Sequence, residues 1–300
     1  MDYTADELLD RGQLLISSGQ PDLALPFLQK LLAAHPGNTA ALDLLGEAHF
    51  DLGNLPEAKR VFEQSVQLGG PDEVGTKWMM LGQLTHGEES LRYYTRGMQL
   101  LERDASHDPL RRQQLAAAHV NVAELYMSDL CMIHDAEERC EWACAEAQRL
   151  DPESLEAVLV TASMRISQCR VDEAKELLLR IGAKLTTLGD EHSYDFRLSA
   201  ARLLVEVEEN NMALTILERL VLEDDEIAEV WMLMGLIHQE QDKDTARECY
   251  ERALELLTEF AKYEAEFAAM ADRANELLMA LDPSPPPQAV KRSKKKKQHR

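Results

Sequence analysis

A pattern that returns every 34 residues constrains this chain more than any other feature of its sequence. Gly12 and Gly46 are separated by that interval, and so are Ala24 and Ala58. In each copy the small residues are followed, at helical spacing, by large apolar ones. A short helical unit of this kind cannot cover its apolar face alone, so successive units must stack against one another. The interval therefore predicts a solenoid of paired helices.

Thirty-four residues is the length of the tetratricopeptide repeat (TPR), a helix-turn-helix unit. Later copies of the pattern are marked by Gly82, Tyr94, Cys140, Ala147, Ala174, Ala213, Gly235 and Tyr250. We therefore expect an all-α fold, a TPR superhelical solenoid of about seven helix-turn-helix repeats over residues 5–259. A C-terminal capping helix is expected over residues 260–282, with a polar outer face, as such arrays need. A disordered tail, first Pro-rich and then basic, is expected over residues 283–300.

Close packing gives the pattern its physical meaning. Small residues such as Gly46 allow two helices to approach, and large ones such as Phe62, Trp78, Tyr250 and Trp231 are expected to fill the gaps beside them. The stack should then curve into a right-handed superhelix with a concave inner face.

Two repeats depart from the regular spacing. The distance from Gly82 to Ser90 is eight residues, where the first two repeats have twelve between the corresponding positions. The distance from Ala123 to Cys140 is seventeen residues, which predicts about five extra residues near positions 132–135.

The charge of the chain limits its partners. Lys and Arg number 32 against 54 Asp and Glu, a net charge of −22. Nucleic acids and anionic membranes attract cations, so we expect no direct nucleic-acid partner and no membrane partner. No apolar stretch is long enough to span a bilayer, and the acidic N-terminus does not resemble a signal peptide. Five cysteines in such a chain indicate a reducing cytosolic or nuclear compartment.

No arrangement of residues indicates catalysis or a cofactor. The sequence lacks phosphate-binding loops, nucleophile-elbow motifs and zinc-protease motifs. Cys131, His134, Cys140 and Cys144 suggest a metal site as a less favoured alternative, because their spacing matches no common zinc pattern. Cys140 and Cys144 occupy positions of the repeat that are normally apolar, so we interpret them as small buried hydrophobes. We expect a protein that is not an enzyme and binds no metal.

The concave face is the predicted binding site. In TPR arrays the first helix of each repeat lines the groove, and here those helices carry many carboxylates with apolar residues between them. Such a groove suits a basic peptide, since carboxylates meet Lys or Arg and the apolar residues cover their methylene stems. The alternative is that an acidic protein has acidic residues on every face. The predicted client-binding residues are Asp43, Glu47, Phe50, Asp51, Glu124, Met127, Asp129, Glu206 and Glu240.

A different TPR groove, the clamp that holds the acidic C-terminal tails of heat-shock chaperones, requires Lys and Asn at its contact positions. The corresponding positions here include Asp43 and Glu47, so charge disfavours that function. A general TPR scaffold or co-chaperone adaptor that bridges two protein partners stays open as the alternative function.

The tail has two interpretations. Its basic residues form a short run similar to a nuclear import signal that importin binds, and the alternative is a basic tail that folds back on the acidic body of the same protein. The predicted import residues are Lys291, Arg292, Lys294, Lys295, Lys296 and Lys297.

Several segments resemble one family of TPR proteins. They are residues 81–84 (LGQL), 123–131 (AELYMSDLC), 135–140 (DAEERC), 172–178 (DEAKELL) and 223–226 (EDDE), the last followed by Trp231. These segments are similar to the dedicated TPR chaperones of large-subunit ribosomal protein L-four. The resemblance implies a chaperone that binds this newly made, basic client, shields it, and delivers it to the nucleus for large-subunit assembly. It also implies a protein that is both cytoplasmic and nuclear.

Overall fold

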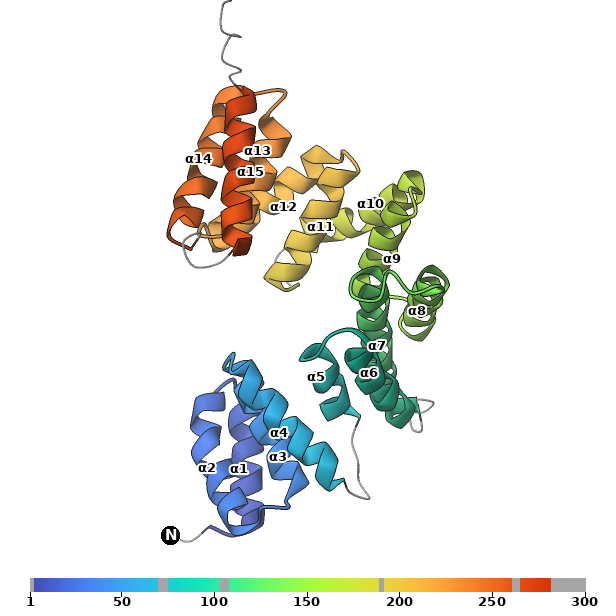
Figure 1. Cartoon of the computed structure of the whole chain (residues 1–300), viewed down its shortest axis with the longest axis vertical. Helices are drawn as coiled ribbons and strands as arrows, with labels where there is room; N and C mark the ends of the chain where they lie inside the picture. The colour runs from blue at the N-terminus through green and yellow to red at the C-terminus, as the bar shows by residue number, and fades with distance from the viewer. Residues whose placement is uncertain (1–2, 70–74, 103–107, 189–191, 261–264, 282–300) are drawn as a thin grey trace, which may run out of the picture. The chain divides into compact units, whose positions relative to one another are not determined.

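The computed structural model describes residues 3–69, 75–102, 108–188, 192–260 and 265–281. Fifteen α-helices and no β-strand occupy these residues, which confirms the all-α prediction (Figure 1). No helix in this part of the chain is both long and apolar enough to cross a membrane. The helices are α1 (Ala5–Ser17), α2 (Pro21–Ala34), α3 (Thr39–Asp51), α4 (Leu55–Leu68), α5 (Thr76–Gln83), α6 (Gly87–Glu102), α7 (Pro109–Met127), α8 (Ala136–Leu150), α9 (Leu155–Ser167), α10 (Val171–Leu188), α11 (Tyr194–Glu206), α12 (Asn210–Glu223), α13 (Ala228–His238), α14 (Lys243–Phe260) and α15 (Ala265–Leu281).

The chain divides into two compact units between Arg170 and Val171. The first unit contains α1 to α9, and the second contains α10 to α15. The division falls between the two helices of the predicted fifth repeat, so α9 packs within the first unit and α10 within the second.

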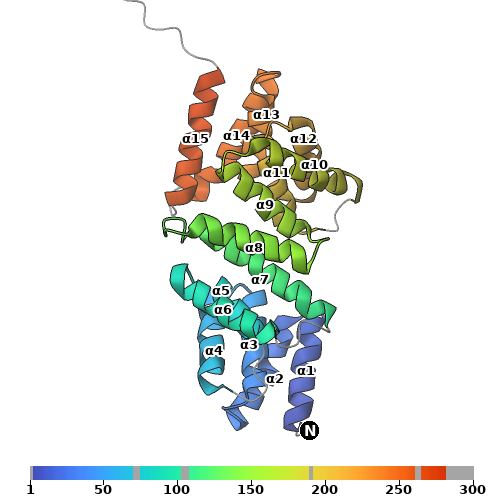
Figure 2. The same ribbon diagram turned by 90° about the vertical axis from the view of Figure 1, so that its right-hand side faces the viewer.

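In the first unit, neighbouring helices pack in pairs. The pairs are α1 with α2, α3 with α4, α5 with α6, and α7 with α8, and α9 packs against α7 and α8. Helices α1 to α4, coloured from blue to cyan, lie side by side in both views (Figure 1 and Figure 2). Helix α2 continues through Pro26 without interruption.

The small-to-large packing predicted from the repeat is confirmed. A Cβ atom added to Gly46 of α3 would lie 2.6 Å from the Phe62 ring of α4, so only glycine allows this approach. Gly235 of α13 meets Tyr250 of α14 in the same way, at 2.4 Å. Phe62 and Tyr250 are fully buried. Trp78 and Trp231, by contrast, are only half-buried and do not fill the core as expected.

In the second unit, α10 packs against α11 and α12, α13 pairs with α14, and α15 covers α14. Ala274 and Leu277 of α15 are buried, whereas Asp272, Arg273 and Glu276 are exposed. This polar outer face agrees with the expected cap, although α14 runs to Phe260 and α15 begins only at Ala265. The predicted tail, residues 283–300, lies outside the described residues.

Candidate functional site

The inner face of the first unit contains a hollow between α1, α3 and α5. We call it the first hollow; its volume is about 280 Å³. It is built from the first helix of each of three successive repeats, as the sequence predicts for a TPR groove. Its lining residues are Leu9, Asp10, Gln13, Ala40, Asp43, Leu44, Glu47, Thr76 and Lys77.

Two further hollows continue from the first. The second hollow, of about 140 Å³, is lined by Thr76, Met79, Gln83, Leu101, Gln114, Ala117, Ala118 and Asn121. The third hollow, of about 300 Å³, is lined by Gly82, Gln83, Thr85, His86, Ser90, Tyr94, Asn121, Glu124, Leu125, Ser128 and Asp129. Thr76 is shared by the first two, and Gln83 and Asn121 by the last two, so the three hollows are adjacent; we call them together the inner groove.

The charged residues of the inner groove are mostly acidic. Five carboxylates line it, those of Asp10, Asp43, Glu47, Glu124 and Asp129, against the single ammonium group of Lys77. Carboxylates of this kind suit a cationic ligand, and the preference for one stays a prediction.

Asp43 is held by an internal network. The Ser65 hydroxyl donates a hydrogen bond of 2.5 Å to Asp43 Oδ1, and Lys77 Nζ lies 3.5 Å from Asp43 Oδ2. Lys77 also donates to Ser65 Oγ at 3.0 Å and is only 4% exposed. Burial raises the pKa of Asp43, against the opposing effect of the Ser65 and Lys77 hydrogen bonds. The network joins α3, α4 and α5, and it already compensates the charge of Asp43.

Glu47 and Glu124 have no such compensation. Within the described residues, neither carboxylate has a cation at ion-pairing distance. Burial raises the pKa of Glu47, and the neighbouring charges of Asp43 and Asp51 raise it further. Solvent reaches the Glu124 side chain, yet the surrounding groove walls displace enough water to raise its pKa as well. A bound cation would relieve the unfavourable energy of both carboxylates.

Asp129 lies in the loop between α7 and α8 and fixes that loop to the neighbouring repeat. Its Oδ2 accepts a 2.8 Å hydrogen bond from the Gly87 backbone N–H and lies 3.7 Å from His86 Nδ1. The extra residues that the sequence predicts near positions 132–135 fall within this loop of residues 128–135. Ser128 and Asp129, at the start of the loop, form one wall of the third hollow.

Phe50, Asp51 and Met127 line none of the three hollows. Phe50 is half-buried and packs against the cluster of Ala58, Phe62 and Leu81. Met127 is half-buried against the larger core cluster around Tyr126. Asp51 is exposed at the last residue of α3. Their role in client binding stays a prediction.

Glu206 and Glu240 belong to the second unit, where Glu206 ends α11 and Glu240 follows α13. Both are exposed. The structure therefore brings Asp43, Glu47, Glu124 and Asp129 into the inner groove and leaves Glu206 and Glu240 outside it. The import residues 291–297 lie outside the described part of the chain.

The sequence analysis missed several polar groove residues. Gln114 and Asn121 of α7, and Ser128 directly after it, line the groove together with Glu124. The spacing from Gln114 to Asn121, Glu124 and Ser128 is seven, three and four residues, which is that of one helix face, so extending the predicted acidic face in both directions from Glu124 would have found them. Lys77 gave no such signal, because its burial depends on the contact with Asp43.

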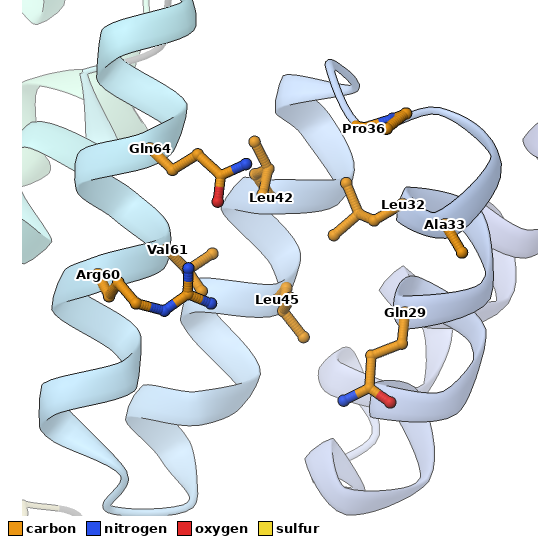
Figure 3. Close-up of a pocket in the computed structure, with 9 residues that line it drawn as sticks. All are labelled: Gln29, Leu32, Ala33, Pro36, Leu42, Leu45, Arg60, Val61 and Gln64. Carbon is orange, nitrogen blue, oxygen red and sulfur yellow. The ribbon is translucent and has the colours of Figure 1, made fainter.

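A fourth hollow lies on another face, between α2 and α4. Its volume is about 310 Å³, and Leu42 and Leu45 of α3 lie between its two walls (Figure 3). Its lining includes no carboxylate, and its only charged residue, Arg60, is paired with Glu57 at 2.6 Å. This apolar hollow does not suit a cationic ligand, so the inner groove is the candidate site.

The cysteines favour packing over metal binding. Cys140 and Cys144 are buried in α8, and the Cys140 thiol donates to the Ala123 carbonyl oxygen at 3.5 Å. Their burial confirms the interpretation as small core residues. Cys131 is exposed. Across the described ranges, no group of three or more His, Cys, Asp or Glu side chains is placed to hold a metal ion.

Comparisons with known proteins agree with this fold. Family models described as "Tetratricopeptide repeat" match residues 15–72 and 228–256. A solved structure titled "Assembly Chaperone of RpL4 (Acl4)" superimposes with a TM-score of 0.71 at 31% identity, covering 81% of this chain and 98% of that one. The APC/C hetero-tetramer Cut9-Hcn1, at 12% identity and a TM-score of 0.66, covers 91% of this chain and 49% of that one, and shows the fold alone.

Two curated relatives are each named "Probable assembly chaperone of rpl4". The protein of Schizosaccharomyces pombe is 34% identical over 248 residues, which cover 78% of this chain and 74% of the relative. The protein of Emericella nidulans is also 34% identical and covers 76% of this chain and 63% of the relative. The resemblance noted in the sequence is thereby confirmed, and the chain belongs to the family of TPR assembly chaperones of ribosomal protein L-four (RpL4).

Proposed function

We propose that this protein is an assembly chaperone that binds newly made RpL4 in the inner groove of its first unit. The uncompensated carboxylates of Glu47 and Glu124 are the observation that carries the site. A ribosomal protein must present cations to RNA phosphates, so before assembly it carries basic segments that attract the wrong polyanions. An acidic groove binds these basic segments and so keeps them from other polyanions. The role is one of binding and delivery, without catalysis and without a cofactor.

The field of the whole groove contributes more than any single contact. An exposed ion pair is worth only about 0–1 kcal/mol. Several carboxylates together attract a basic segment from a distance, speed its capture and reject acidic chains. Ribosomal RNA, with a higher density of negative charge, would then displace the groove by competition for the same cations.

A titration of purified RpL4 against the wild type and Glu47→Lys tests the proposal. We expect the charge reversal to weaken binding roughly fivefold to tenfold, about 1 kcal/mol or slightly more. The matched control is Glu218→Lys, since Glu218 is exposed on α12 and lines none of the three hollows. Equal affinities for all three proteins would refute the groove as the site, and no RpL4 binding by the wild type would refute the function.

We also propose that the basic residues 291–297 bind importin and carry the protein from the cytoplasm into the nucleus. The support is the run of Lys and Arg in the sequence. Deleting residues 283–300 should abolish nuclear accumulation of a fluorescent fusion. Unchanged accumulation would contradict this role of the tail and would leave import to the client.

A further inference from the structure

The third hollow is a shallow site that is widely open to solvent. It is lined by α5, α6 and α7 together with the α7–α8 loop, and its volume of about 300 Å³ lies at the lower end of the range for small-ligand pockets. Two departures from the regular repeat create it. Gly87 begins α6 after the short α5–α6 turn, and Asp129, at the start of the long α7–α8 loop, accepts a hydrogen bond from its backbone N–H.

Tyr94 provides a hydroxyl group at the edge of this pocket. The residue is 4% exposed, and its ring packs so closely on Gly82 that an added Cβ would lie 2.8 Å from it. Within the described residues its hydroxyl has no hydrogen-bond partner, whereas the adjacent Ser90 hydroxyl is satisfied by the Gly82 carbonyl at 2.6 Å. Burial raises the pKa of Tyr94, and the charge of Glu124 raises it further, so the phenol stays neutral.

The rest of the lining supplies acceptors. Glu124 has no cation partner in the described structure, and Asp129 uses only Oδ2 for the Gly87 contact. The side-chain amides of Gln83 and Asn121 add two carbonyl oxygens, again without a recorded partner in this part of the chain. His86, the one basic side chain of the lining, is 92% exposed. Within the described residues, the carboxylate of Glu124 and Oδ1 of Asp129 are thus acceptors without a donor, whereas Oδ2 of Asp129 accepts from Gly87.

We propose, on the basis of the proposed client-binding function, that the third hollow binds one arginine side chain of the client, with the guanidinium between Glu124 and Asp129 and against Tyr94. Arginine fits better than lysine for two reasons. Its planar group has five N–H donors for this acceptor set, whereas lysine has three. It is also less strongly hydrated than an ammonium group, so it loses less hydration free energy on entering the pocket.

Fluorine NMR of the full-length protein labelled with 3-fluorotyrosine tests the pocket directly. The chain has seven tyrosines, and Tyr94→Phe assigns the resonance of Tyr94. The probe is the peptide acetyl-Gly-Arg-Gly-amide, with acetyl-Gly-Lys-Gly-amide for comparison. We expect the arginine peptide to shift the Tyr94 resonance saturably with a Kd of about 1 mM, and the lysine peptide to bind at least roughly fivefold more weakly. No shift, or equal affinity for both peptides, would overturn the proposal.

Two conservative variants locate the interaction. Glu124→Gln keeps the shape of the side chain and should weaken the arginine peptide at least roughly fivefold. Glu218→Gln makes the same change at an exposed position of α12 that lines none of the hollows, and it should leave the peptide affinity unchanged. A Glu124→Gln protein that binds as tightly as the wild type would exclude Glu124 as the guanidinium partner. Thermal unfolding of each variant verifies that the fold is intact.

An RpL4 titration separates this inference from the proposed function. If RpL4 binds and Glu47→Lys weakens it, while Tyr94→Phe and Glu124→Gln have no effect, the arginine pocket is wrong and the chaperone function stands. If the arginine peptide shifts Tyr94 but RpL4 does not bind, the pocket stands and the client is wrong.

Discussion

At the scale of single residues, Asp43 and Glu47 show how similar side chains one helical turn apart receive different roles. Their sequence context is alike, and both were predicted to contact the client. The structure pairs Asp43 with Ser65 and Lys77, whereas Glu47 has no counterion. Lys77 is 34 residues from Asp43, one full repeat, so the pairing joins equivalent positions of neighbouring repeats. The 34-residue interval shows which positions of neighbouring repeats are equivalent, but it does not show which of these residues are in contact.

The Asp43–Lys77 pair should be needed for stability. Asp43→Ala leaves the Lys77 ammonium buried without its counterion, which we expect to lower the free energy of unfolding by about 2–3 kcal/mol. Asp43→Ala combined with Lys77→Met removes both charges and should recover most of that loss. Urea denaturation of the three proteins measures the difference. If Asp43→Ala proves as stable as the wild type, Lys77 must find water or another partner, and Asp43 is then free to bind a client.

The carboxylate of Glu47, which is proposed to bind the client, should lower the stability of the fold. Burial and the charges of Asp43 and Asp51 raise its folded pKa above the unfolded value, so the folded protein holds this proton more tightly. Ionised Glu47 therefore destabilises the fold at neutral pH, and the penalty disappears as the pH falls through the folded pKa. Glu47→Gln should raise the free energy of unfolding at neutral pH by roughly 0.5 kcal/mol, with a smaller gain at acidic pH.

Denaturation at both pH values checks the sign of the Glu47 effect. Glu218→Gln, on the exposed face of α12, serves as the control and should leave stability unchanged at either pH. A Glu47→Gln protein less stable than the wild type at neutral pH would mean that the carboxylate is stabilised by a partner in solution.

At the scale of helices, the sequence predicted most of the contacts between helices and fewer of the residues that line the groove. The contact of Gly46 with Phe62 has counterparts in other repeats because the two helices of each repeat must approach equally closely. The tryptophans departed from this rule because each has a partner at the surface. Trp231 Nε1 donates to the Asp225 carbonyl oxygen at 2.8 Å, and the Trp78 ring lies 5.8 Å from the Arg96 guanidinium. The third hollow was not predicted, because it arises from two irregular turns that meet in space.

Helix ends offer a stability prediction. The first helices of repeats one and two are followed by Gly19 and Gly53 with positive φ, whereas Glu208 follows α11 with a φ of 62°. Side chains other than glycine are strained in this left-handed conformation. Glu208→Gly should therefore stabilise the protein by about 1 kcal/mol, and Gly53→Ala should destabilise it by a similar amount. Thermal or urea unfolding measures both changes, and a destabilised Glu208→Gly would show that the Glu208 side chain makes a compensating interaction.

At the scale of the whole molecule, the repeat pattern and the site have different extents. Because the repeat pattern is the same in every repeat, the client contacts predicted from it extend from Asp43 to Glu240. The inner groove described here gathers four of the predicted carboxylates in the first unit. Charge and repeat position predicted an acidic groove, and four of the predicted carboxylates line these hollows; their role in binding a client stays a prediction. The ion pair of Asp43 and the packing around Tyr94 could not be predicted from the sequence, because both depend on contacts between separate repeats.

The net charge of −22 leads to a prediction for the rate of client capture. Exposed charges act over about 8–10 Å near physiological salt, and over shorter distances as salt rises. The association rate of RpL4 should therefore fall roughly tenfold between about 0.1 and about 0.5 M salt, while the dissociation rate changes less. Stopped-flow measurements give both rates. Glu47→Lys should show a smaller dependence on salt than the wild type, and Glu218→Lys should show less of this reduction because it lies outside the groove. An association rate that does not respond to salt would mean that apolar contacts, and not the carboxylates of the inner groove, select the client.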